Sequence, residues 1–122
     1  MSKIEKMTEN GGYVIDVQPA KKKVYMDVVG AFTTEQAEQF QYDYQQKIGS
    51  ISTINYLLEI DCKDFEVIDE KMLPKLMHSF KLYKASEFKK IEFLISNNIE
   101  IRKQLESVAE TADLSNYEII DA

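Results

Sequence analysis

The sequence has few of the residue types that usually form catalytic or metal sites, since its 122 residues include one cysteine and one histidine. The single cysteine, Cys62, cannot form an intrachain disulfide, which fits a reducing compartment. The histidine, His78, has no recognisable nucleophile or orienting partner. The chain contains no zinc-ligand spacing, phosphate-binding glycine loop, nucleophile elbow or dinucleotide motif. We therefore expect no catalytic residues, no metal, no cofactor and no enzymatic activity.

Long hydrophobic runs are also missing. No stretch approaches the ~20 apolar residues of a membrane span, and the polar N-terminus does not resemble a signal peptide. The net charge of -6 disfavours binding to nucleic acid or to anionic headgroups. Hydrophobic residues make up 44% of the chain and charged residues 30%, which is ordinary for a globular protein. The composition predicts a soluble, cytoplasmic protein without a membrane span.

The length fits one domain. Residues 1–12 are polar and end in Asn10-Gly11-Gly12, so they are predicted to be a flexible N-terminal segment. Residues 13–122 have no linker composition and no internal repeat. They are expected to form a single α/β domain.

Five short runs rich in β-branched and apolar residues predict strands. They cover residues 13–17, 24–29, 56–60, 91–95 and 117–120. The first two are separated by a turn-like segment at Pro19 and predict a hairpin, which is expected to be the only antiparallel pair. The third run is almost wholly apolar, as expected for a central strand covered on both faces.

Three segments repeat apolar residues at spacings of three and four, which predicts amphipathic helices. They lie at 33–48, within 69–84, and at 97–112. The predicted capping pairs are Thr33 with Gln36 and Asn97 with Glu100. Pro74 places the regular start of the second helix near residues 71–73. The resulting order, ββαβαβαβ, predicts a mostly parallel sheet of about five strands packed with helices.

This order, at this length, resembles the STAS domain, the fold of bacterial anti-sigma factor antagonists and of sulfate-transporter tails. The resemblance covers about 13–120 and is carried by three segments. Residues 28–33 resemble the family's second strand running through a glycine into the first helix. Residues 57–61 resemble its central strand, and 65–69 resemble the turn into its second helix. The resemblance implies a STAS-like sandwich and a regulatory role through protein binding.

The chain departs from the signalling members of that family at the start of the second helix. Those members carry a serine or threonine there that a partner kinase phosphorylates. The corresponding stretch here is 69–72, and no serine or threonine lies between Thr53 and Ser79. The usual phospho-switch therefore has no acceptor. Glu70 either imitates a permanent negative charge or is an ordinary carboxylate at a solvated helix start.

The first functional hypothesis is a non-catalytic regulatory interaction domain with an unidentified protein partner. The expected contact surface runs from Asp64 to Lys75 and includes the exposed face of the second helix. Its named residues are Asp64, Asp69, Glu70, Lys71 and Lys75. Carboxylates crowd this segment, but they lack the spacing and the glycine of a calcium loop. The lysines between 71 and 90 form either an anionic docking surface or a solvated helix face.

The alternative hypothesis is a carrier of an apolar small molecule or lipid, as proposed for STAS-like proteins that lack the signalling segment. Its pocket would be lined by Met72, Leu73, Leu76, Met77 and Phe80. The same residues at the same spacing also describe ordinary core. A pocket of at least ~300 Å³ would favour the carrier. A weak acid–base or metal enzyme built on Asp61, Asp64 and Asp69 is a third hypothesis, and the sequence leaves open whether the chain forms a homodimer.

Overall fold

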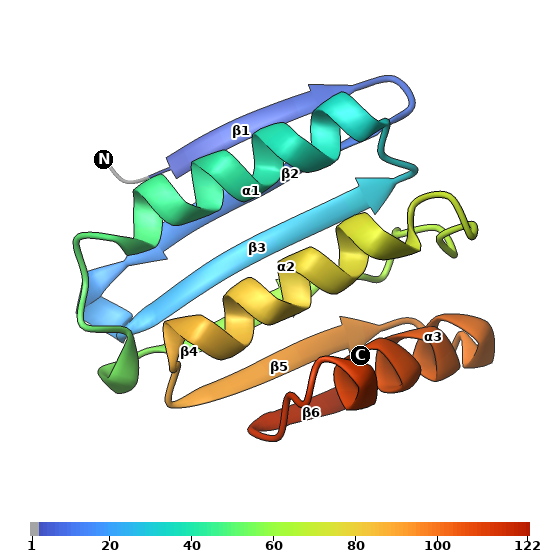
Figure 1. The fold of residues 1–122 in the computed structure, drawn as a ribbon. Coiled ribbons are helices and arrows are strands. Elements are labelled where there is room, and N and C mark those ends of the chain that lie inside the picture. The colour runs from blue at the N-terminus through green and yellow to red at the C-terminus, as the bar shows by residue number, and fades with distance from the viewer. Residues whose placement is uncertain (1–2) are drawn as a thin grey trace.

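The computed structural model describes residues 3–122, which form one sheet and three helices (Figure 1). The strands are β1 (Lys3–Thr8), β2 (Gly11–Gln18), β3 (Lys23–Gly30), β4 (Leu57–Asp61), β5 (Lys90–Ile95) and β6 (Tyr117–Asp121). The helices are α1 (Thr34–Ile48), α2 (Leu73–Ser86) and α3 (Ile99–Thr111). Two short 3-10 turns, Pro19–Lys21 and Thr53–Asn55, precede β3 and β4. None of the helices in this part of the chain is long and apolar enough to cross a membrane.

The six strands lie in the sheet in chain order. The pairs β1–β2 and β2–β3 are antiparallel, and the three remaining pairs are parallel. The mostly parallel α/β class is confirmed. The six strands are close to the predicted number of about five. The expectation of a single antiparallel pair was wrong, because β1 extends the hairpin into a three-stranded antiparallel unit.

The additional strand lies in the segment that the sequence predicted to be flexible. Residues 3–8 pair with β2, from Lys3 opposite Asp16 to Thr8 opposite Gly11. Ile4 packs against the core, and the Lys6 ammonium lies 2.9 Å from the buried carboxylate of Asp43 on α1. An edge strand exposed on one face needs few apolar residues, so its sequence does not show the usual hydrophobic signal. Residues 1 and 2 of the predicted segment lie outside the described residues.

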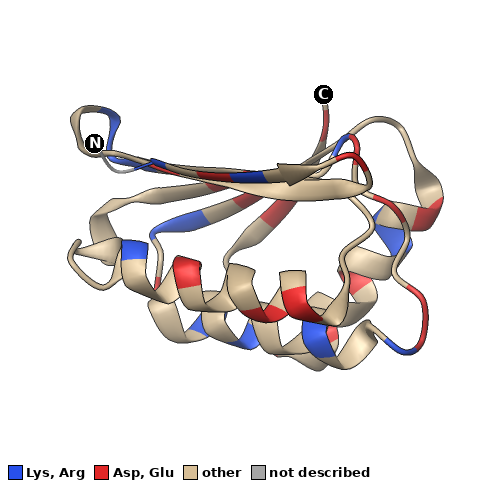
Figure 2. Cartoon of the chain, turned by 90° about the horizontal axis from the view of Figure 1, so that it is seen from above, with Lys and Arg blue, Asp and Glu red and all other residues tan. Residues whose placement is uncertain are grey.

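All three helices cover the same face of the sheet, as Figure 2 shows. Side chains alternate accordingly along β3, where Val24, Met26 and Val28 are buried under the helices and Tyr25 and Asp27 face the uncovered side. Because β3 to β6 follow one another in order, right-handed crossovers place every helix on one face. The prediction that β4 is covered on both faces was therefore wrong.

Helix starts agree with the capping predictions at α1 and differ by one residue at α3. Thr33 and Gln36 form the expected capping box, with a Thr33 Oγ1 to Gln36 N distance of 3.1 Å. At α3 the capping residue is Asn98, whose side chain accepts from two backbone N–H groups of the first turn. Asn97 instead adopts a positive φ of 47° and donates its backbone N–H to Asp121. Helix α2 starts at Leu73, with Pro74 in the first turn as predicted.

Candidate functional site

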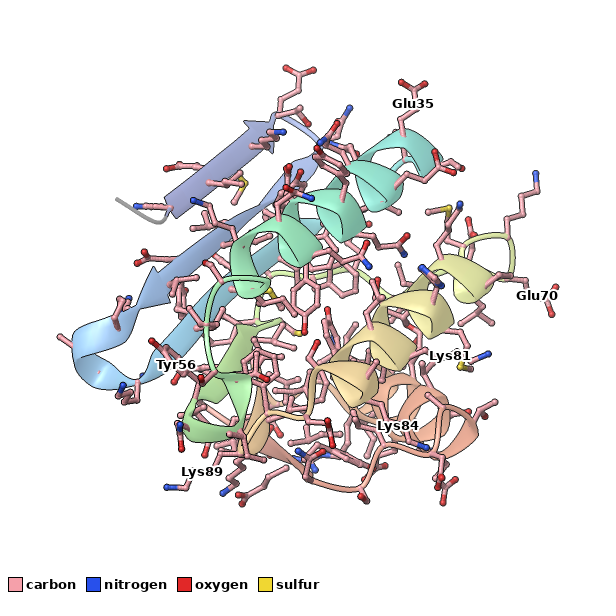
Figure 3. The ribbon with its side chains drawn as sticks, turned by 60° about the vertical axis from the view of Figure 1, so that its left-hand side comes forward. Glu35, Tyr56, Glu70, Lys81, Lys84 and Lys89 are labelled. Carbon is pink, nitrogen blue, oxygen red and sulfur yellow. The ribbon has the colours of Figure 1, made fainter. Side chains whose placement is uncertain are left out.

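The loop that joins β4 to α2, residues 62–72, follows the carboxyl end of a central parallel strand. Ligands of open α/β sheets tend to bind beyond this edge. Most charged side chains that the sequence predicted as contact residues are in this loop, and Asp64, Asp69, Glu70 and Lys71 are exposed. Figure 3 shows Glu70 projecting from the loop just before α2. The structure therefore brings these four residues to one surface segment, which we call the β4–α2 loop.

The first half of the β4–α2 loop is fixed to the end of β3. Gly30 donates its backbone N–H to the Asp64 carbonyl at 2.8 Å, and the Gly30 carbonyl accepts from the Glu66 N–H at 3.1 Å. Gly30 has a φ of 70°, and a side chain there would collide with the carbonyl oxygen of Asn10. Only glycine fits at this position, where the end of β3 passes close to the backbone of the turn between β1 and β2. The loop therefore begins as a short extension of the sheet.

The second half of the loop is fixed to α3 by one side chain. The Gln104 amide accepts from the Ile68 N–H at 2.8 Å and donates to the Ile68 carbonyl at 2.7 Å. Both polar groups of Ile68 are thereby satisfied away from any strand or helix. Two fixed points leave Val67 between them, and its side chain is 45% exposed. The loop presents an apolar side chain on a backbone held at both sides.

The start of α2 has no side-chain cap. Met72 occupies the capping position, and its N–H donates to the Asp69 backbone carbonyl and side chain at 3.1 and 3.2 Å. Where signalling members of the family carry a serine or threonine, this chain therefore has a turn closed by the Asp69 carboxylate. Glu70 is exposed beside it.

Lys75, the fifth predicted contact residue, lies on the first turns of α2 and not in the loop. It is half-buried, and its Nζ lies 2.6 Å from the Glu38 carboxylate on α1. The other lysines of this segment are also engaged in part, since Lys84 pairs with Asp113 and Lys90 with Glu92 and Glu118. Lys81 and Lys84 are further along α2 (Figure 3). Three of the six lysines between 71 and 90 are therefore paired with carboxylates.

Within residues 3–122, no group of three His, Cys, Asp or Glu side chains is arranged to hold a metal ion. Asp61 is held by the Lys63 ammonium at 3.6 Å. On the uncovered face, burial raises the pKa of Asp27, and the charges of Asp61 and Asp64 raise it further. These carboxylates make the region negative without converging on a common point.

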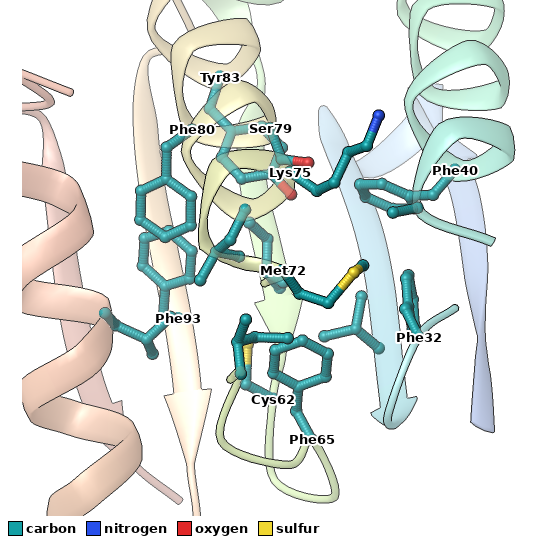
Figure 4. A pocket seen from close by; sticks show the side chains of 16 residues that line it. Phe32, Phe40, Cys62, Phe65, Met72, Lys75, Ser79, Phe80, Tyr83 and Phe93 are labelled. Carbon is teal, nitrogen blue, oxygen red and sulfur yellow. The ribbon is translucent and has the colours of Figure 1, made fainter. Parts of the chain in front are cut away.

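A small apolar cleft opens beside the loop, between α1 and α2 (Figure 4). Its floor is formed by buried side chains that include Cys62, Phe80 and Phe93. Its rim consists of half-buried side chains from the segment between β3 and α1, from the β4–α2 loop and from α2. They are Phe32, Phe65, Ile68, Met72, Lys75 and Leu76. Phe32 and Phe65 meet edge to face with ring centres 5.8 Å apart. The cavity volume is about 50 Å³.

Three of the five predicted pocket residues, Met72, Leu76 and Phe80, line this cleft. Leu73 and Met77 do not line it and pack partly buried against the core instead. Sequence reasoning missed the aromatic wall of Phe32 and Phe65. Phe32 comes shortly after the end of β3, and Phe65 shortly after the end of β4. Their positions just beyond these strand ends were the signal in the sequence that could have identified them.

The cysteine and the histidine have different environments. Cys62 is 4% exposed, and burial raises the pKa of its thiol, with Asp61 and Asp27 adding to the effect. The thiol therefore stays protonated at neutral pH, as expected of a structural residue. His78 is exposed on α2.

Comparison with known proteins gives a fold. A scan against protein-family models and a search of curated proteins gave no match. Two solved structures are similar over nearly the whole chain. One is an uncharacterized protein of the DUF3478 family with a SpoIIAA-like fold from Shewanella loihica PV-4, with a TM-score of 0.68 and 17% identity over 96% of this chain and 93% of that one. The other is apo-SiaC from Pseudomonas aeruginosa, with a TM-score of 0.61 and 12% identity over 98% of this chain and 99% of that one.

Both structures match the fold of this chain over nearly their whole length, and one of them is described as SpoIIAA-like. Identities of this size carry the fold and not the activity. The chain therefore has a SpoIIAA-like, STAS-type α/β fold.

Proposed function

We propose that the chain is a non-catalytic regulatory domain that binds a protein partner through the β4–α2 loop and the start of α2. The observation that carries the proposal is the double fixation of this loop, by Gly30 on one side and Gln104 on the other. A loop ordered before binding loses little conformational entropy when a partner docks. Val67 supplies an exposed apolar contact at its centre, and charged side chains surround it. An apolar centre with a polar rim is the usual anatomy of a protein interface.

The SpoIIAA-like fold supports this proposal, since the STAS resemblance implies regulation by protein binding. The absent hydroxyl at the start of α2 changes the expected control. Phosphorylation would add up to about two negative charges at that helix start. Here Glu70 provides a constant charge, so the partner's affinity should not depend on a kinase acting at this position.

The carrier hypothesis is less well supported. The cleft volume of about 50 Å³ is well below the ~300 Å³ of typical small-molecule pockets. Native mass spectrometry of the purified protein, with a denatured control, tests it separately. A reproducible extra mass that disappears on denaturation would favour the carrier.

Site-directed photo-crosslinking in the native host tests the interaction proposal. A photoreactive amino acid is placed at Val67 or Glu70, and a control is placed at Gln46, which is exposed near the opposite end of α1. We expect a discrete protein adduct from both loop positions and none from Gln46. Adducts of equal yield at all three positions, or none from the loop, would contradict the proposal.

The partner identified from the adduct can then be purified in its free form, and its binding to charge-reversed variants of the loop can be measured. Glu70→Lys should weaken its binding while the circular dichroism spectrum stays unchanged. Lys71→Glu, one residue away on the same exposed turn, should change binding in the opposite direction if the partner is basic. Lys75 is a poor choice for this test, because reversing its charge would place a carboxylate against Glu38.

A further inference from the structure

The cleft between α1 and α2 is lined mainly by apolar side chains. Gln41 donates to the Lys75 carbonyl at 3.0 Å and to the Ser79 hydroxyl at 3.1 Å, so the polar groups of its helix wall are paired with one another. Among the side chains of residues 3–122, no buried nitrogen or oxygen lacks a hydrogen-bond partner. These walls therefore favour an apolar occupant, since a polar group against the aromatic and aliphatic side chains would lose its water without compensation.

The size of the cleft limits that occupant. One water-sized group needs roughly 10–15 Å³ of such volume. The cavity of about 50 Å³ thus takes roughly three to five groups of methyl or methylene size. That is the size of one valine, leucine or isoleucine side chain. A long acyl chain or a ring system does not fit.

The side chain of Met72 lies across the cleft opening. It extends toward Phe32 in Figure 4, and its Sδ lies 3.7 Å from the Thr34 hydroxyl at the start of α1. This contact is weak and exposed, and methionine adapts readily to irregular shapes. Met72 is therefore able to close over an inserted side chain or to move aside for it.

The charge around the opening indicates which residues flank that side chain. The β4–α2 loop carries four carboxylates and two ammonium groups: Asp64, Glu66, Asp69 and Glu70 against Lys63 and Lys71. Lys63 is paired with Asp61, and Lys75 on the rim is paired with Glu38. The surroundings of the opening are negative, so they attract a cationic segment and repel an acidic one.

We propose that this cleft takes one aliphatic side chain from the protein partner, on a segment whose neighbouring residues are lysine or arginine. The inference rests on the proposed interaction function and assigns the chemistry of the partner at the same site. The inserted side chain displaces water from apolar walls, and the flanking cations pair with the loop carboxylates. A single buried anchor of this kind is the usual centre of binding energy in an interface.

A peptide titration of the full chain tests this without knowing the partner. The probe is a capped Lys-Arg-Leu-Arg-Lys peptide, followed by the methyl signals of Met72, Ile68 and Leu76. We expect saturable shifts at these methyls with a millimolar dissociation constant. Replacing the central leucine by alanine should weaken binding roughly 10-fold or more, and replacing the flanking cations by glutamate should abolish it.

Matched variants locate the binding. Ala37 lines the cleft and is 7% exposed, so Ala37→Met fills it from α1. Ala85→Met makes the same change at an exposed position of α2. Ala37→Met should weaken the binding of the peptide, and of the partner identified by crosslinking, by about 10- to 100-fold. Ala85→Met should leave both affinities unchanged. Because the peptide series uses the wild-type chain, it does not depend on the folding of either variant.

Each other outcome overturns the inference and identifies what replaces it. Equal binding of the leucine and alanine peptides means that the cleft is not used. Methyl shifts with octanoate that exceed those with the peptide mean an acyl ligand, and shifts that grow with protein concentration alone mean a second copy of the chain. Partner affinity unaffected by Ala37→Met would remove the cleft from the interface while leaving the proposed function in place.

Discussion

At the scale of single residues, the uncovered face of the sheet contains an unfavourable charge. Burial raises the pKa of Asp27 above its ordinary value, and the neighbouring Asp61 and Asp64 charges raise it further. The unfolded chain does not have these neighbours. The folded protein therefore holds a proton at Asp27 more tightly than the unfolded chain does, so ionised Asp27 destabilises the fold at neutral pH. This penalty decreases as the pH falls through the raised pKa.

We expect Asp27→Asn to increase the free energy of unfolding at pH 7 by about 0.5 kcal/mol, a value reduced for solvent screening. The gain should shrink as the pH falls and vanish below the ordinary aspartate pKa, where both chains carry no charge there. Urea unfolding of both proteins across this pH range measures it. Glu106→Gln, at an exposed position on α3, is the control and should show no such trend. A gain that persists at low pH would mean that packing, not charge, is responsible.

At the scale of elements, the β4–α2 loop owes its order to contacts with two other elements. The contact between Gln104 and Ile68 joins residues 36 positions apart. Sequence periodicity places Gln104 on α3 but gives no indication of this partner. By contrast, the extent of α1 and the start of α2 follow from local signals, the Thr33 capping box and Pro74, and were predicted.

Gln104→Ala removes both hydrogen bonds to the Ile68 backbone. We expect amide hydrogen exchange at residues 66–70 to become roughly 5- to 30-fold faster, which corresponds to ~1–2 kcal/mol of local stability. Exchange in the central strands should change much less, because they open only with the whole domain. Gln46→Ala, on the exposed side of α1, is the matched control. Unchanged exchange in the loop would show that Gly30 alone is sufficient to order it.

At the scale of the whole molecule, the sequence predicts the fold better than the site. Alternation of apolar strands and amphipathic helices identifies the parallel α/β core, because burial under one helical layer imposes both periods. The same logic misses β1, since Lys3, Glu5 and Lys6 face solvent or a single buried carboxylate. It also misses the cleft, because Phe32 and Phe65 meet only once β3 and β4 lie side by side.

Asp64, Asp69, Glu70 and Lys71 are exposed in the loop, while Lys75 lies on α2 and pairs with Glu38. Ion pairing between helices depends on tertiary packing, which the spacing of lysines along one helix does not reveal. The sequence therefore identifies the segment of the candidate site and not its geometry.

The central claim is that a partner docks on the β4–α2 loop, and two exposed apolar residues at opposite ends of β4 allow a direct test. Val67 follows β4 and is 45% exposed, whereas Ile54 precedes it and is 61% exposed. The measurement uses the partner that photo-crosslinking identifies, purified in its free form. Its affinity is measured for the Val67→Asp and Ile54→Asp variants. The account predicts that Val67→Asp binds at least about 10-fold more weakly than wild type and that Ile54→Asp binds as wild type does. Equal affinities for both variants would contradict it.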